Sequence, residues 1–130
     1  MPQATSAVVL PAPVQTYFDA LNAEDIAALR PLWAPNVELR AVGSRARRGL
    51  EEVMEYFGPL FDPWVEHLDL PTRVIGDPDG DAVAVEVRFT GRTEGGRELT
   101  FDAVDVFDLA DGKIRRLSTW YDLVWLRKQL

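Results

Sequence analysis

The sequence predicts an α+β domain in which helices come first and an antiparallel sheet follows. In the first half, apolar residues recur at spacings of three and four, which is typical of helices that bury one face. In the second half, three turn signals rich in Gly and Asp separate four stretches of about ten residues. Segments joined by such short turns form an antiparallel meander. We therefore expect the helices to pack on one face of a curved, mainly antiparallel sheet.

Three helices are expected before the meander. The first carries an apolar stripe at positions i, i+3, i+4 and i+7, formed by Val14, Tyr17, Phe18 and Leu21. Pro11 or Pro13 suits its beginning. A second, short helix is expected over residues 25–32. A third has an apolar stripe from Leu50 to Phe61, and Gly58 and Pro59 indicate that it bends or ends there. Between these two we expect a short strand at 37–42 and a loop at 43–49.

Four strands are expected in the second half, over residues 66–75, 81–92, 97–109 and 113–122. Valines and a phenylalanine alternate with Ala84, Glu86 and Arg88 in the second of them, which predicts a sheet covered on one face. The sequence contains no repeat, linker or low-complexity tract. One domain is therefore expected over residues 1–130, with residues 1–10 as a flexible N-terminal arm.

Composition and charge restrict the function. The 130 residues are 47% apolar and 27% charged with a net charge of −7, which suits one soluble domain and argues against nucleic acid as a partner. The chain has no cysteine and one histidine, so thiolate and multi-histidine metal sites are excluded. No motif implies a metal or an organic cofactor. Neither a signal peptide nor a membrane span is indicated, and the expected location is the cytoplasm.

Asp105 is the most informative residue. Side chains alternate between the faces of a strand, and in 97–109 Asp105 shares its face with five apolar residues, Leu99, Phe101, Ala103, Phe107 and Leu109. A carboxyl group on an apolar face either stays protonated or finds a partner. Either state suits acid–base chemistry. The alternative is a structural aspartate that ties down a turn or pairs with an arginine such as Arg88 or Arg115.

Other polar and aromatic residues have both structural and functional interpretations. Tyr17 on the first stripe is either a core aromatic or a pocket phenol, and His67 is either a partly buried surface residue or a catalytic group. The aromatic pair Trp120 and Tyr121 suits core, interface or ligand contacts. The basic cluster at 45–48 is either a solvated loop or an anion site.

Several of these segments resemble a known family. Asp102-Ala103-Val104-Asp105-Val106, then Gly112-Lys113-Ile114 and Trp120-Tyr121, resemble the last meander strands of bacterial ketosteroid isomerase. Tyr17-Phe18, Asp25-Ile26-Ala27-Ala28-Leu29, Trp33-Ala34 and Arg48-Gly49 resemble its helical half. The resemblance extends to the wider NTF2-like superfamily, including SnoaL-type polyketide cyclases and limonene-epoxide-hydrolase-like enzymes. It implies a cone-shaped fold, three N-terminal helices on a curved sheet, and an apolar pocket.

The resemblance also implies site residues. In the isomerase a tyrosine and a protonated aspartate form the oxyanion hole. The matching positions in this sequence are Tyr17 and Asp105. The isomerase's first-strand base falls on Ala41 or Leu39, neither of which moves a proton, and its supporting helix-three tyrosine falls on Phe57. We predict Asp105 and Tyr17 as catalytic residues. The predicted substrate-binding residues are Leu39, Ala41, Phe57, His67, Val87, Phe89, Phe101, Phe107, Thr119, Trp120 and Tyr121.

Three function classes remain open. The first is an enzyme of the isomerase or cyclase type, acting by acid–base chemistry on a hydrophobic ketone, polyketide or isoprenoid-like substrate through an enol-like intermediate. The second is a pocket that only binds a hydrophobic ligand. The third is a dimeric association module, with Val104, Val106, Trp120 and Trp125 on an apolar outer face; a homodimer through the sheet is compatible with all three. Epoxide opening, as in an epoxide hydrolase/cyclase, is a variant of the first, with His67 as a second acid–base group.

Overall fold

The fold combines helices with one six-stranded sheet. The computed structural model describes residues 8–77 and 79–130. In this part of the chain the α+β class is as predicted, and the helices number four. The elements in order are α1 (Ala12–Asn22), the 3-10 helix η1 (Ile26–Leu32), β1 (Trp33–Ala41), β2 (Arg47–Arg48), α2 (Leu50–Phe57), β3 (Trp64–Gly76), β4 (Ala82–Thr93), β5 (Glu98–Ala110), β6 (Lys113–Trp120) and α3 (Leu123–Gln129).

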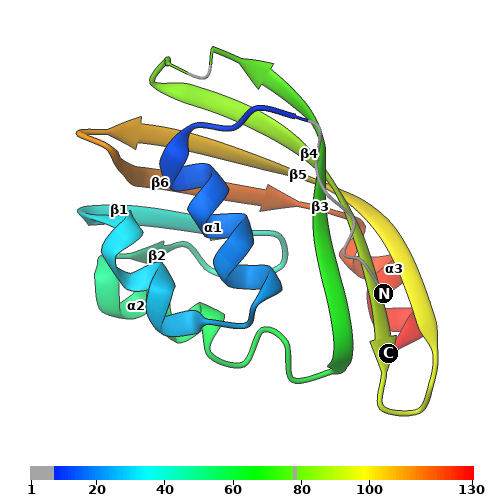
Figure 1. Cartoon of the computed structure of the whole chain (residues 1–130). Helices are drawn as coiled ribbons and strands as arrows, with labels where there is room; N and C mark the ends of the chain where they lie inside the picture. Colours follow the sequence, from blue (N-terminus) through cyan, green and yellow to red (C-terminus); the bar gives the residue numbers. More distant parts are fainter. Residues whose placement is uncertain (1–7, 78) are drawn as a thin grey trace.

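The sheet has the strand order β2-β1-β6-β5-β4-β3. The predicted meander β3-β4-β5-β6 is present, and each of its neighbouring pairs is antiparallel. Among the strands of the described residues, only β1 pairs in parallel, with β6, because the chain leaves the sheet through α2 before the meander begins. Figure 1 shows the resulting curved sheet, with α1, η1 and α2 on one side of it.

The first two helices begin where their sequences favour a beginning. Pro11 is the residue before α1 and Pro13 lies in its first turn, where the missing N–H costs no helical hydrogen bond. The apolar stripe of α1 is buried as expected. Asp25 begins η1, since its carboxylate accepts a hydrogen bond from the backbone N–H of Ala28 at 3.2 Å.

The expected elements differ most from the observed ones at three places. β1 begins at Trp33, four residues before the expected strand, and so includes Pro35. The expected loop at 43–49 contains β2, which pairs with Glu38 and Leu39. The third helix ends at Phe57, directly before Gly58 and Pro59 as expected, and the rest of its apolar stripe, to Phe61, lies in the turns that follow. The C-terminal helix α3 was not predicted, because its residues follow directly after the last strand.

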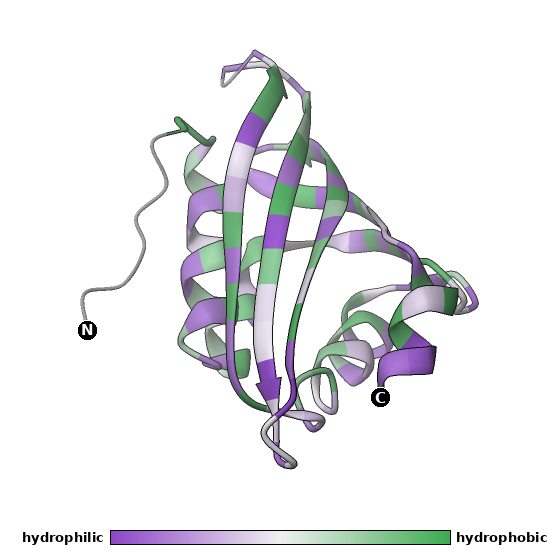
Figure 2. Ribbon diagram, turned by 90° about the vertical axis from the view of Figure 1, so that its right-hand side faces the viewer, coloured by the Kyte–Doolittle hydropathy of each residue, from purple (hydrophilic) through white to green (hydrophobic). Residues whose placement is uncertain are grey.

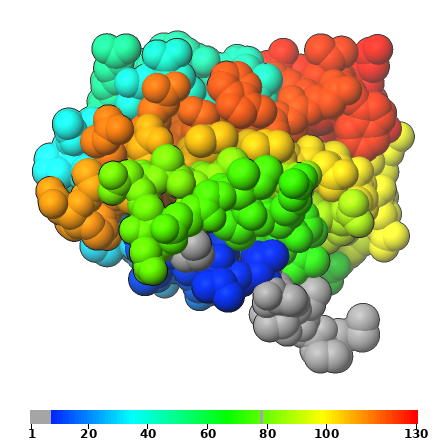
Figure 3. Space-filling model, turned by 90° about the horizontal axis from the view of Figure 1, so that it is seen from above, coloured from blue at the N-terminus to red at the C-terminus, as the bar shows by residue number. Residues whose placement is uncertain are grey.

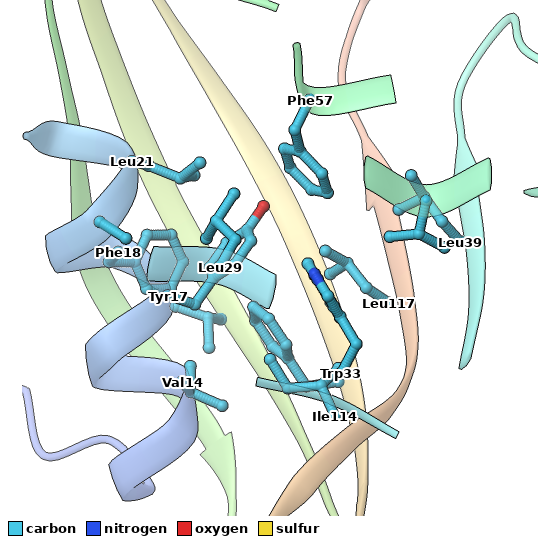
Figure 4. Close-up of a cluster of buried hydrophobic side chains, with 14 of the residues drawn as sticks. Val14, Tyr17, Phe18, Leu21, Leu29, Trp33, Leu39, Phe57, Ile114 and Leu117 are labelled. Atoms are coloured by element: carbon cyan, nitrogen blue, oxygen red, sulfur yellow. The ribbon is translucent and has the colours of Figure 1, made fainter. Parts of the chain in front are cut away.

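The core lies between the helices and the sheet. Figure 4 shows side chains from α1, η1, β1, α2 and β6 converging there, and Val14, Leu29, Ile114 and Leu117 have no exposed surface. Along the strands, hydrophobic and hydrophilic residues alternate, as Figure 2 shows by colour. One face of the sheet therefore packs against the core, and the other faces solvent.

The two ends of the chain pack on this body. Residues 1–7 of the expected arm lie outside the described residues, but Leu10 belongs to the core cluster. At the other end, α3 lies on the surface beside β5, where Figure 3 shows red next to yellow and the rings of Phe101 and Trp125 are 6.3 Å apart. No helix in the described part of the chain has the length and apolar character to cross a membrane.

Candidate active site

A pocket of about 310 Å³ opens between the sheet, α2 and α3. This volume is in the range of sites for small organic ligands. Most of the wall is apolar or aromatic, from strands β3 to β6 and from the chain around α2. Two carboxyl groups, Asp69 and Asp105, interrupt it, together with three phenols, Tyr17, Tyr56 and Tyr121. Such a pocket suits a hydrophobic molecule that carries few polar atoms.

Asp105 projects from β5 into this pocket. Its exposed fraction is 6%, and it lies opposite Thr119 of β6 and Val85 of β4. The predicted alternation of β5 is therefore correct at this position. The arginines offered as structural partners bind other acids: Arg88 contacts Asp102 at 3.1 Å and Arg115 contacts Asp108 at 3.5 Å.

The pKa of Asp105 is raised from 3.8 to about 7. Burial is the largest cause, because removing water disfavours the ionised form. A hydrogen bond from the Thr119 hydroxyl opposes this by stabilising the carboxylate, and the negative charge of Asp69 raises the pKa further. Near neutral pH the group therefore exists in both protonation states and can donate or accept a proton.

Tyr17 brings its phenol to the pocket from α1. The ring is 4% exposed and meets Phe18, Trp33, Phe57 and Phe107 edge to face, with centroids 5.1–6.0 Å away. These rings fix its direction, which Figure 4 shows among Leu29, Trp33 and Phe57. Burial, then the charges of Asp105 and Asp69, raise the pKa of Tyr17 well above 10. The phenol is thus a hydrogen-bond donor at neutral pH.

Asp69 is a pocket residue that the sequence analysis missed. It lies on β3 opposite Phe89, and its side chain is 18% exposed. Its neighbours His67, Glu66 and Arg73 give that segment the appearance of a solvated strand. Its backbone is fixed by Asn22 at the end of α1, whose side-chain amide donates to Asp69 O at 3.0 Å and accepts from Asp69 N at 2.8 Å.

Tyr56 on α2 is the second pocket residue that was missed. The supporting tyrosine of the isomerase falls on Phe57, which has no hydroxyl group. The preceding residue, Tyr56, places a phenol in the pocket wall instead. Burial is the main cause that raises the pKa of Tyr56 above its usual value, and it therefore keeps its proton. The Arg47 guanidinium lies 5.6 Å from the centre of the Tyr56 ring, so this member of the basic cluster supports the pocket wall.

Seven of the predicted substrate-binding residues line the pocket: Leu39, Phe57, Val87, Phe89, Phe101, Thr119 and Tyr121. The structure brings these together with Asp105 and Tyr17 as expected from alternation along the strands. Their roles in binding stay predictions, since the structure holds no ligand.

Four predicted substrate-binding residues lie outside the pocket wall. Trp120 follows the inward-facing Thr119, so its side chain points to the outer face and is 47% exposed. Phe107 is fully buried beneath the pocket against Tyr17 and Phe18. Ala41 is buried opposite Thr119, and its single methyl group does not reach the cavity.

His67 is the fourth of these residues. Its ring stacks on Phe61 with centroids 3.9 Å apart and planes 6° apart, and of these two residues only Phe61 lines the pocket. The residue is partly buried, as one of the two interpretations expected, and its side chain is 2% exposed and contacts Glu24. Among the described residues, no three His, Cys, Asp or Glu side chains are grouped so as to hold a metal ion.

Comparison with known proteins agrees with this fold. The chain matches the SnoaL-like domain family over residues 14–117, from α1 to β6. The chain belongs to this SnoaL-like family. The NTF2-like superfamily implied by the resemblance is therefore confirmed. A search of curated proteins found no match for this SnoaL-like domain.

Solved structures share the fold of this SnoaL-like domain. A candidate SnoaL-like polyketide cyclase from Jannaschia sp. CCS1 is 23% identical, with a TM-score of 0.78 and 98% and 96% of the two chains covered. A protein of ketosteroid isomerase-like fold from Catenulispora acidiphila is 16% identical, with a TM-score of 0.77 and 88% of each chain covered. The epoxide hydrolase/cyclase-like enzyme SalBIII, which acts in pyran ring formation in salinomycin, is 25% identical, with a TM-score of 0.73 and 87% and 90% covered.

Proposed function

We propose that this SnoaL-like domain is an enzyme that moves protons on an apolar, enolisable small molecule, such as a hydrophobic ketone or a polyketide intermediate. The observation that carries the proposal is Asp105, a buried carboxyl group in an apolar pocket whose pKa is raised to about 7. Carboxyl groups with perturbed pKa values in a concave pocket are typical of acid–base catalysis.

The base of ketosteroid isomerase lies on its first strand, where this chain has Leu39 or Ala41, neither of which moves a proton. In the proposed reaction Asp69 takes the place of that base. The Asp69 carboxylate takes a proton from the carbon next to the carbonyl group. The electrons of that C–H bond form a C=C bond, and the carbonyl π electrons move to the oxygen. Protonated Asp105 and the Tyr17 phenol donate hydrogen bonds to this oxygen, which stabilises the enolate-like state. Returning the proton to another carbon restores the carbonyl group and completes an isomerisation. Alternatively, the enolate carbon attacks a second carbonyl group, whose oxygen takes the proton from Asp69, and this completes a cyclisation.

Binding of 2-naphthol tests the oxyanion site. This apolar phenol resembles the enol of a bicyclic ketone, and its fluorescence reports binding and ionisation. We expect it to bind the wild type and to bind Asp105→Asn at least about tenfold more weakly, since a donor to the oxygen is changed. Asp102→Asn, an aspartate of the same strand on the opposite face, is the matched control. Equal affinity for the wild type and Asp105→Asn would make Asp105 a structural acid.

Epoxide opening is a second candidate, favoured by the presence of two carboxyl groups in one pocket and by the likeness to SalBIII. In this reaction Asp69 would activate water or a substrate hydroxyl, and Asp105 would protonate the epoxide oxygen. Hydrolysis of 1-phenylcyclohexene oxide, followed by chromatography, distinguishes the two reactions. Binding of these probes without conversion of any epoxide or enolisable ketone would instead favour a ligand-binding domain.

The homodimer stays a prediction. Val104 and Trp120 are neighbours across β5 and β6 on the outer face, with 37% and 47% exposed. Light scattering at micromolar concentration measures the oligomeric state directly.

A further inference from the structure

His67 connects the pocket to the surface. Its Nε2 atom lies 3.0 Å from Glu24 Oε1, and its Nδ1 atom lies 3.7 Å from Asp69 Oδ2. Glu24 is half-exposed, His67 is 2% exposed and Asp69 lines the pocket. The three side chains therefore form a continuous series from solvent, through a buried imidazole, to the candidate base.

The contact between His67 and Asp69 brings two hydrogen-bond acceptors face to face. A carboxylate only accepts hydrogen bonds, so the Nε2 atom donates to Glu24, and in the neutral ring Nδ1 is then an acceptor. Nδ1 thus faces Asp69 Oδ2, another acceptor, and neither buried atom has a hydrogen-bond partner. A separation of 3.7 Å is too long for a hydrogen bond. A proton received by Asp69 would give both atoms the partner that they lack.

Glu24 is held in place at a conformational cost. Its φ angle is +53°, in the left-handed region where glycine is favoured. It ends α1 in a Schellman motif, in which Asp25 N donates to Ala20 O at 2.9 Å and Glu24 N donates to Leu21 O at 3.0 Å. Residues held in such strained backbone conformations are concentrated at functional sites.

The geometry of the series is rigid. Asn22, two residues before Glu24, makes both of its amide hydrogen bonds to the backbone of Asp69. The end of α1 and the pocket segment of β3 are thereby fixed to each other. The other side chains stacked on the imidazole, Phe61 and Phe89, are apolar, so Glu24 and Asp69 are the charged groups that face it.

We propose that Glu24 and His67 form a relay that accepts the proton removed by Asp69, with His67 as a positioning residue for that base. This inference rests on the proposed function. When Asp69 takes a proton from the substrate, that proton moves from Oδ2 to Nδ1 of His67 and the Asp69 carboxylate is regenerated. Nε2–H stays hydrogen-bonded to Glu24, whose negative charge stabilises the imidazolium ion. The proton returns by the same path when the product is formed, so no other reactant is needed.

Nuclear magnetic resonance of His67 tests the relay without measuring turnover. The chain has a single histidine, so in tag-free protein the ring ¹⁵N signals need no assignment. We expect the free wild type to show the tautomer protonated at Nε2. On addition of 2-naphthol, whose acidic proton enters the pocket, we expect both ring nitrogens to become protonated. In Asp69→Asn and Glu24→Gly this response should be lost, whereas Glu55→Gln, which changes an exposed glutamate on α2, should behave as the wild type.

Steady-state kinetics give an independent readout. The probe is 3-cyclohexen-1-one, whose conversion to 2-cyclohexen-1-one moves one proton from C2 to C4. Glu24→Gln and Glu24→Gly should lower kcat by about tenfold or more with little change in KM, because Glu24 does not contact the substrate. Glycine is favoured at this φ angle, so Glu24→Gly keeps the fold.

The outcomes separate the two proposals. If 2-naphthol binding depends on Asp105 but the His67 signals stay the same with and without 2-naphthol, the relay is wrong and the proposed function stands. An Nδ1-protonated tautomer in the free protein would also overturn the relay. If 2-naphthol does not bind, or binds Asp105→Asn equally well, the proposed function fails and the relay fails with it.

Discussion

Asp105 lies directly opposite Thr119 across the β5–β6 pair, and the Thr119 hydroxyl donates a hydrogen bond to its carboxylate. This contact lowers the pKa of Asp105, whereas burial and the charge of Asp69 raise it. The balance places the pKa at about 7, so both protonation states are populated near neutral pH.

The raised pKa of Asp105 predicts a dependence of stability on pH. The folded protein binds this proton more tightly than the unfolded chain, so the contribution to stability is full below about pH 4 and is lost as the pH rises to about 7. A shift from 3.8 to about 7 corresponds to about 4 kcal/mol. Asp105→Asn should therefore be more stable than the wild type at pH 8, and this advantage should shrink toward pH 4. Urea unfolding at several pH values, with Asp102→Asn as control, measures it.

Thr119→Val should raise the pKa of Asp105 further. Valine fills the same volume but donates no hydrogen bond to the carboxylate. Asp69→Asn should act in the opposite direction, because it removes a nearby negative charge. The ¹³C signal of the Asp105 carboxyl group, identified by its absence in Asp105→Asn, reports both shifts. Two variants that move the titration in the same direction would contradict this account.

Tyr17→Phe should separate the contribution of the ring to stability from the contribution of the hydroxyl group to the proposed reaction. The ring contacts with Phe18, Trp33, Phe57 and Phe107 remain, so the free energy of unfolding should change by less than about 1 kcal/mol. Loss of the phenol should lower kcat for 3-cyclohexen-1-one by about tenfold or more. Thermal unfolding and steady-state kinetics on the same samples check the two parts. Unchanged kcat would remove Tyr17 from the oxyanion site.

Gly91→Ala should damage the pocket mouth. A Cβ atom at this position would lie 2.6 Å from the Trp64 ring and 2.8 Å from the Phe89 ring, and both rings line the pocket. Overpacking of this kind costs about 1–3 kcal/mol. Gly95→Ala is the matched control, because its nearest contact would be Thr93 Oγ1 at 3.9 Å. Equal stability of the two variants in urea would contradict the expectation.

Glu24→Gly should leave the stability unchanged or raise it by about 1 kcal/mol, despite the loss of a contact to His67. Removing the side chain relieves the left-handed backbone at φ +53°, which costs a residue other than glycine about 1–2 kcal/mol. Thermal unfolding of Glu24→Gly beside Glu55→Gln checks this. A loss of more than about 1 kcal/mol would show that Glu24 is retained for stability.

The sequence by itself determined the α+β class, the meander and the inward direction of Asp105. These follow from local periodicity: alternation along 97–109 places Asp105 on the apolar face, and the spacing from Val14 to Leu21 places Tyr17 on the buried stripe. The helix–strand order and these residues also carried the resemblance to the NTF2-like superfamily. The pattern could not anticipate α3, because a short helix after a strand has too few residues for a clear period.

Only the tertiary structure brings Asp69 into the candidate site. In the sequence, His67 and Asp69 lie among charged neighbours and give β3 the pattern of a solvated edge strand. In the fold, Asn22 from the end of α1 binds the backbone at Asp69, and Phe61 covers His67. These contacts join residues 47 and 6 positions apart and bury two polar side chains that local alternation leaves exposed. A candidate base and its histidine partner therefore arise from packing between distant segments, which periodicity does not report.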